Sequence, residues 1–189
     1  MKKIIMVFMG SLMLNGIAMA KDSDKQALNI CALAIPLLKQ YIVNYEYLYG
    51  QRHGLAARVE YAPMSDDAIS SSGRAVVLNY RWHFSRSMES YFAGPYARYR
   101  EVSGTGTAGG VAFDFTIPEW TIGVNVGKRW VWRNGFNVVL SAGLGVSTQT
   151  ETVNPTNAAI DSAITTLKTD HPTYFNTPSY GEFSIGYVF

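Results

Sequence analysis

The stretch Tyr180-Gly-Glu-Phe-Ser-Ile-Gly-Tyr-Val-Phe189 decides the fold class. Every second position carries an apolar or aromatic side chain, namely Phe183, Ile185, Tyr187 and Phe189. Three of the positions between them are polar or small: Glu182, Ser184 and Gly186. A period of two is that of a β-strand with one apolar face, so the stretch predicts a strand that ends at Phe189.

The same period of two recurs in seven further segments upstream. They cover residues 27–35, 40–48, 55–62, 74–84, 90–100, 116–132 and 136–146. The connections after the second, fourth and sixth segments are short, and Asn134-Gly135 in the last of them favours a type I′ hairpin. Longer connections are expected at residues 64–73, 102–110 and 147–178, whereas the connection after the first segment is short. The pattern predicts an all-β fold of eight antiparallel, up-and-down strands.

The first twenty residues predict export. Met1-Lys-Lys3 is basic, residues 4–17 are apolar, and Ala18-Met-Ala20 has the small-residue pattern of a cleavage site. We therefore expect a signal peptide at 1–20 and one mature barrel domain at 21–189. Removing Lys2 and Lys3 leaves 14 of the 16 basic residues against 14 acidic ones. A neutral mature chain argues against a nucleic-acid partner.

The chemistry of the two faces separates a membrane barrel from a soluble one. A soluble barrel points its apolar face inward, whereas a membrane barrel points it toward lipid. Here the polar face carries Arg, Glu and many Gly but almost no Lys. Aromatic residues gather near the strand ends: Trp82, Phe84, Trp130, Trp132, Phe136 and Phe189. Such girdles are typical of membrane interfaces. We expect an eight-stranded transmembrane barrel in a bacterial outer membrane, with the membrane lipids as partners.

The polar face would then fill the lumen with charge. The residues concerned are Glu46, Arg58, Glu60, Arg81, Arg98, Glu119, Arg129 and Glu182. Charges inside a narrow barrel must pair, because unpaired charge away from water is costly. We expect a salt-bridge network that plugs the lumen. The alternative is a narrow channel or a proton path, for which eight strands leave little space.

Several segments resemble known barrels in their order and spacing. They are residues 78–84, 91–100, 123–130, 134–136, 142–145 and 181–189. Together they resemble the small OmpA/OmpX-like outer-membrane barrels, and are similar to an exported barrel family of unknown function. The resemblance implies a fold and a location in the outer membrane but no activity. It also implies that the barrel-insertion machinery recognises the last strand, where Tyr187 and Phe189 match the family pattern.

One constellation allows an enzymatic alternative. His83 and Ser85, with Glu89 nearby, resemble the base, nucleophile and orienting residue of outer-membrane lipid A deacylases. The expected register places His83 in the lumen beside a periplasmic turn, whereas such an enzyme needs its site in the outer leaflet. Arg86 stands where those enzymes usually carry Asn. We therefore expect no catalytic activity and treat a lipid A-modifying hydrolase as the alternative.

The remaining polar residues predict neither a metal nor a cofactor. His53 and His171 have no ligand spacing, and Cys31, the only cysteine, has no disulfide partner. Residues 157–168 carry apolar side chains at helical spacing, with Asn157 as a possible N-cap. This helix could cap the barrel mouth or meet an extracellular partner. We expect a structural or surface-interaction protein that acts through its extracellular loops, with 147–178 foremost.

Overall fold

The structure is a computed structural model that describes residues 25–32, 34–65, 69–172, 174–175 and 179–189. The expected signal peptide at 1–20 lies outside these residues. The strands are β1 (Gln26–Ile30), β2 (Tyr41–Tyr49), β3 (His53–Ser65), β4 (Ile69–His83), β5 (Ser90–Ala108), β6 (Val111–Val131), β7 (Phe136–Gln149), β8 (Thr152–Asn154) and β9 (Tyr180–Val188). The helices are α2 (Ala34–Leu38) and α3 (Ala158–Asp170).

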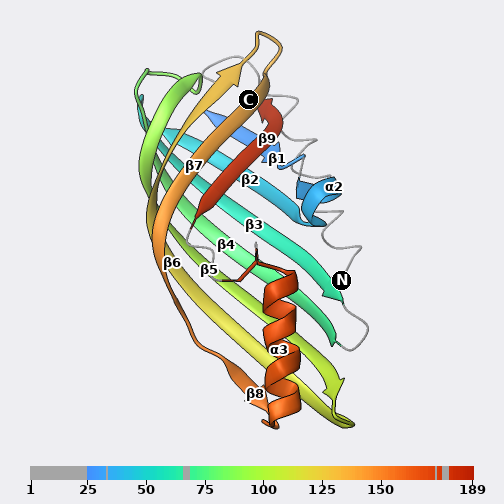
Figure 1. The fold of residues 1–189 in the computed structure, drawn as a ribbon. Helices are drawn as coiled ribbons and strands as arrows, with labels where there is room; N and C mark the ends of the chain where they lie inside the picture. Colours follow the sequence, from blue (N-terminus) through green and yellow to red (C-terminus); the bar gives the residue numbers. More distant parts are fainter. Residues whose placement is uncertain (1–24, 33, 66–68, 173, 176–178) are drawn as a thin grey trace.

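Eight of the strands close into a ring (Figure 1). Each of β1 to β7 pairs antiparallel with its neighbour in sequence, and β9 pairs with both β7 and β1. At the closure, Gln26 N donates to Phe189 O over 2.9 Å and Phe189 N donates to Gln26 O over 2.8 Å. The short strand β8 adds to β6 outside the ring. The prediction of an eight-stranded up-and-down barrel is confirmed.

Two of the predicted long loops are wrong, because strands occupy them. β5 runs to Ala108 and β6 starts at Val111, so the loop expected at 102–110 is a turn at Gly109 and Gly110. Both glycines have positive φ, +59° and +78°, which only glycine adopts without strain. Likewise β3 and β4 fill most of the expected loop at 64–73. Glycine and serine weaken the alternation there, yet the ladder continues through them.

The first predicted segment is also too long. β1 ends at Ile30, and α2 occupies residues expected at the end of that strand and in the turn after it. Pro36 lies in the first turn of α2. Backbone N–H groups in the first turn have no acceptor within the helix, so proline is tolerated there. The helix predicted at 157–168 is confirmed as α3, and its N-cap is Asn157, whose side-chain oxygen accepts from Ile160 N over 3.0 Å.

The long strands project beyond the ring at one end and carry α3 against their inner side (Figure 1). We call this part the extension. It consists of residues 62–65 of β3, 69–73 of β4, 102–108 of β5 and 111–117 of β6, with β8 and α3. The hairpin between β6 and β7 and the C-terminus lie at the opposite end, which we call the turn end.

The hydrophobic alternation changes phase between the ring and the extension. On β6 within the ring, Ile122 and Val124 point outward and are 63% and 64% exposed, while Glu119 is buried inside. Four residues nearer the extension, Phe115 is buried inside and Thr116 faces out. The change falls on one row of paired residues across four strands: Tyr61, Arg74, Glu101 and Pro118. The expectation of a polar lumen therefore fails in the extension, whose inner face is apolar.

Candidate functional site

The outer surface of the ring is a belt of exposed apolar side chains. Its central members are Leu55, Val59, Val76, Leu78, Ile122, Val124, Val126, Leu140, Leu144, Val146 and Phe183. Outward aromatic residues border the belt on both sides. Toward the extension they are Tyr41, Tyr61, Tyr99 and Trp120. Toward the turn end they include Tyr49, Trp82, Tyr91, Trp130, Trp132, Phe136 and Tyr187.

The height of the belt matches the apolar core of a membrane. On β6 it runs from Trp120 to Trp130. Ten residues of strand extend about 33 Å, and a tilt of about 40° reduces this to about 25 Å along the barrel axis. That is about the height of the apolar band on outer-membrane barrels. No helix in the described part of the chain is long and apolar enough to cross a membrane.

A first charge cluster fills the ring toward the turn end. Glu46 of β2 accepts from Arg81 of β4 over 2.6 Å and from Arg129 of β6 over 2.5 Å. Arg81 also pairs with Glu182 of β9 over 2.6 Å, across the interior. The imidazole Nε2 of His83 lies 2.8 Å from Glu46 Oε1. All five side chains are at most 3% exposed, so these charges are balanced without solvent.

A second charge cluster lies toward the extension. Glu119 of β6 pairs with Arg98 over 3.0 Å and with Arg100 over 2.8 Å. Arg58 pairs with Glu60 over 2.7 Å. Arg58 also donates to the carbonyl oxygen of Gly181, 2.9 Å away on the last strand. These contacts tie β5 to β6 and β3 to β9 through their inner faces.

Tyr180 joins the two clusters. Its hydroxyl donates to Glu182 over 2.9 Å, and the guanidinium of Arg58 lies 5.0 Å from its ring centre. The ring also packs against Tyr96 with centroids 5.1 Å apart, beside the buried Val77. Val77, Tyr96 and Tyr180 therefore form a small apolar and aromatic cluster between the two charge clusters. A further apolar cluster closes the turn end: Ala27, Leu48, Met88 and Val188, with Val131 against it.

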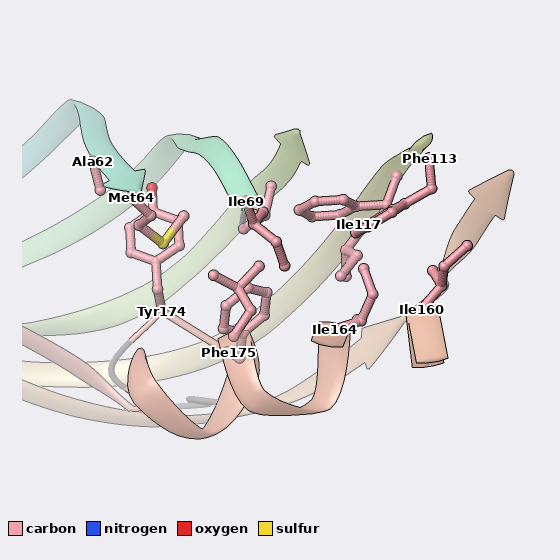
Figure 2. Close-up of a cluster of buried hydrophobic side chains, with 12 residues drawn as sticks. Ala62, Met64, Ile69, Phe113, Ile117, Ile160, Ile164, Tyr174 and Phe175 are labelled. Carbon is pink, nitrogen blue, oxygen red and sulfur yellow. The ribbon is translucent and has the colours of Figure 1, made fainter. Parts of the chain in front are cut away.

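The extension has a hydrophobic core of its own, shown in Figure 2. Ile160, Ile164 and Leu167 of α3 are buried against the inner face of the sheet. The sheet contributes Ala62, Met64, Ile69, Val102, Phe113, Phe115 and Ile117, and the segment after α3 contributes Tyr174 and Phe175. α3 therefore caps the barrel with its apolar face, which is the first of the two roles expected for this helix.

Gly73 makes room for that cap. A Cβ built on Gly73 would lie 1.9 Å from Cε1 of Tyr174, so the ring packs directly on the β4 backbone. On its other side Tyr174 meets Arg100, whose guanidinium lies 5.0 Å from the ring centre. Burial raises the pKa of the Tyr174 hydroxyl above its ordinary value. The phenol therefore stays neutral beneath α3.

All eight lumen residues named from the sequence face inward and belong to the two charge clusters. Three further residues belong to the clusters although the sequence did not single them out for the network: His83, which was expected in the lumen, Arg100 and Tyr180. Arg100 shares the alternation of Arg98, so its inward direction could be read from the sequence but its pairing with Glu119 could not. Tyr180 shares the alternation of Glu182 in the same way.

The three residues of the enzymatic alternative make other contacts. The ring of His83 contacts Glu46 and Phe92 in the interior. The hydroxyl of Ser85 donates to the backbone oxygen of Glu89 over 2.7 Å, in an exposed turn. In the described part of the chain, no hydrogen bond joins His83 to Ser85 or the carboxylate of Glu89 to His83. No group of three metal-ligating side chains occurs there either.

Of the two residues expected to form the insertion signal, Tyr187 is half-exposed on the outer surface and Phe189 pairs with Gln26 at the closure. Together, these features define a closed antiparallel barrel with an apolar belt outside, paired charges inside and a helical cap.

The chain belongs to the family described as "Protein of unknown function (DUF3575)", whose model matches residues 4–189. A search of curated proteins gives no match. Among solved structures, the crystal structure of Acinetobacter baumannii CarO is similar, with 10% sequence identity and a TM-score of 0.41. The similarity covers 89% of this chain and 98% of the CarO chain.

Proposed function

We propose that the protein is a non-catalytic outer-membrane barrel of the OmpA/OmpX-like kind, which holds the extension at the cell surface as a structural or interaction module. One observation carries the proposal: the apolar side chains of the ring face outward while its charged side chains are buried inside. This is the reverse of a soluble barrel and the arrangement that lipid requires.

The size of the belt supports a membrane environment. Soluble monomers rarely expose a continuous apolar patch larger than a few hundred Å². Here, large apolar side chains are exposed on the ring strands all around the barrel, and Leu144 and Val146 are 73% and 70% exposed. In water this surface would drive aggregation. In a bilayer it is the contact surface with the acyl chains.

The contents of the barrel favour a structural role over a channel. An ion or solute crossing the lumen would have to pass the apolar cluster at the turn end, the cluster of Val77, Tyr96 and Tyr180, and the α3 cap. Between them, both charge clusters are occupied by ion pairs. Opening such a path would leave buried charges unpaired, at a cost of several kcal/mol.

The two ends of the barrel suggest an orientation. Outer-membrane barrels have short periplasmic turns and longer extracellular loops. The hairpins β2–β3, β4–β5 and β6–β7 and the C-terminus lie at the turn end, which we place in the periplasm. The insertion machinery would then read Tyr187 and Phe189 from that side. The extension, with residues 147–178, would face the outside and offer its surface to a partner.

Cysteine labelling in intact cells tests both location and orientation. Cys31 is buried, and replacing it by Ala gives a background without a native thiol. On that background, Ala112→Cys places an exposed thiol on the extension and Arg133→Cys places one at the turn end. A membrane-impermeant maleimide should label residue 112 in intact cells and residue 133 only after permeabilisation. The reverse pattern would refute the orientation, and absence from the outer-membrane fraction would refute the location.

A further inference from the structure

The outer face of the extension carries an ordered array of short polar side chains. One row of paired residues across β4, β5, β6 and β8 is Ser72, Ser103, Thr116 and Thr152. The next row is Ser70, Thr105, Asp114 and Asn154. We call these eight residues the hydroxyl face. Neighbouring members are about 4.8 Å apart across the strands and about 7 Å apart along them.

The groups of the hydroxyl face are available to a ligand. All eight are exposed or partly exposed, and the residues that alternate with them, such as Ile69, Phe115 and Ile117, are buried against α3. Within the described residues, none of the eight side chains is engaged in a hydrogen bond or an ion pair with another side chain. Each hydroxyl can donate one hydrogen bond and accept two.

The hydroxyl face continues the lipid-facing surface of the ring. Along β5, outward positions run from Tyr99 in the aromatic border through Glu101 to Ser103 and Thr105. Ser103 and Thr105 lie four and six residues beyond Tyr99, which corresponds to about 10 and 15 Å along the barrel axis at the usual strand rise and tilt. The headgroup layer of a phospholipid leaflet is only about 5–7 Å thick. The face therefore lies above phospholipid headgroups, at the depth of the sugars of a glycolipid.

Charge favours the same ligand. The row between the aromatic border and the hydroxyl face contains Arg74 and Glu101, and Asp114 lies within the face. These charges sum to −1, whereas a phosphate site would present several Arg or Lys side chains. Hydroxyl, carboxamide and carboxylate groups match the donors and acceptors of a neutral sugar. Trp120, at the border, adds an exposed apolar ring beneath them.

We propose that the hydroxyl face binds the saccharide headgroups of glycolipids in the outer leaflet. This inference rests on the proposed function, because the depth argument requires the belt to lie in the membrane with the extension outside. It adds a ligand class to that function: the extension binds the sugars of the membrane in which the barrel sits.

The test uses the full mature barrel in phospholipid nanodiscs, titrated with deacylated lipopolysaccharide oligosaccharide while binding is measured by calorimetry. We compare the wild type with a Ser103→Ala, Thr116→Val, Thr105→Val variant. The matched control carries Thr165→Val and Thr166→Val on the exposed side of α3. The wild type and the control should bind saturably with equal affinity. The face variant should bind at least about tenfold more weakly, since losing two or three hydrogen bonds is worth about that factor.

Three outcomes would overturn the inference: no binding by the wild type, equal affinity in the face variant, or full displacement by inorganic phosphate. Circular dichroism and unboiled gel migration show whether the variant keeps its fold, as expected for surface substitutions. If the variant does not fold, Ser103→Ala alone replaces it and must weaken binding in the same direction. A chain that passes the labelling test but does not bind sugar refutes only this inference, whereas a chain absent from the outer membrane refutes the proposed function.

Discussion

Arg81 of β4 and Glu182 of β9 form an ion pair of 2.6 Å across the inside of the barrel, although three strands separate them around the ring. The same guanidinium pairs with Glu46 over 2.6 Å and lies 4.4 Å from the ring centre of Phe92. Arg81 thus connects the first, middle and last parts of the chain at one point. Ion pairs across the interior therefore join strands that are not neighbours, in addition to the backbone hydrogen bonds between neighbouring strands.

Replacing Arg81 should destabilise the barrel strongly. Arg81→Met leaves Glu46 and Glu182 short of a partner at a buried position, and breaking a buried pair in this way costs about 3–5 kcal/mol. The measurement is urea unfolding of the barrel in phospholipid vesicles, followed by tryptophan fluorescence. Arg74→Met on the same strand is the control, because Arg74 is exposed and should change the free energy of unfolding by no more than about 0.5 kcal/mol. Equal effects of the two substitutions would show that the interior pair contributes no stability.

The contact between Gly73 and Tyr174 predicts that substitutions at these two positions have non-additive effects. Gly73→Ala forces a methyl group into the ring of Tyr174 and should displace the segment after α3, since the ring packs on rigid backbone. Limited proteolysis of the 150–179 segment in intact vesicles should then become faster. Tyr174→Ala should remove most of the added effect of Gly73→Ala, because the colliding ring is gone.

Gly181→Ala is the matched control, because no described atom lies within 4 Å of the Cβ it would add. Cleavage of the Gly73→Ala variant at the wild-type rate, or strict additivity of the two substitutions, would contradict the packing of the cap described above.

Ser85→Ala should leave lipid A unchanged. The Ser85 hydroxyl donates to the backbone oxygen of Glu89, and His83 contacts Glu46 inside the barrel, so neither contact activates Ser85 as a nucleophile. Mass spectrometry of lipid A from cells with no protein, the wild type and Ser85→Ala checks this. Three identical profiles agree with a non-catalytic barrel. A lipid A species made by the wild type and lost in Ser85→Ala would establish the hydrolase instead.

The purified barrel should not conduct ions. The apolar cluster at the turn end, the cluster of Val77, Tyr96 and Tyr180, and the core beneath α3 place buried side chains along the path that an ion would take. In planar bilayers the wild type should therefore give no steady single-channel currents, at either polarity. A reproducible unitary conductance that disappears when the barrel is unfolded would support the channel alternative.

The strands could be predicted because the apolar outer surface and the polar interior of the ring impose strict alternation on its strands. On β6 the outward Ile122, Val124 and Val126 make the period unmistakable, and the turn at Asn134 and Gly135 marks its end. The pattern weakens where the extension begins, since Gly104 and Gly106 interrupt it and the apolar side moves from outside to inside. If the apolar side chains are assumed to stay on one face along each strand, these residues are therefore assigned to loops although they form strands.

The direction of each charged side chain followed from the same alternation, but its partners did not. Glu46 and Arg129 are 83 positions apart in sequence and meet at 2.5 Å because the closed ring brings β2 opposite β6. Only the tilt and register of the ring determine which inward charges meet. The place of His83 in the lumen could likewise be predicted, whereas its contact with Glu46 could not.

The central claim is that the belt faces lipid and the extension does not. The most direct measurement attaches an environment-sensitive fluorophore to Val124→Cys or Thr105→Cys, each with Cys31→Ala, in vesicles whose acyl chains carry bromine. Bromine quenches only fluorophores that touch the acyl chains, so residue 124 should be strongly quenched and residue 105 should not. Quenching of residue 124 by aqueous iodide, with none from brominated lipid, would contradict the account.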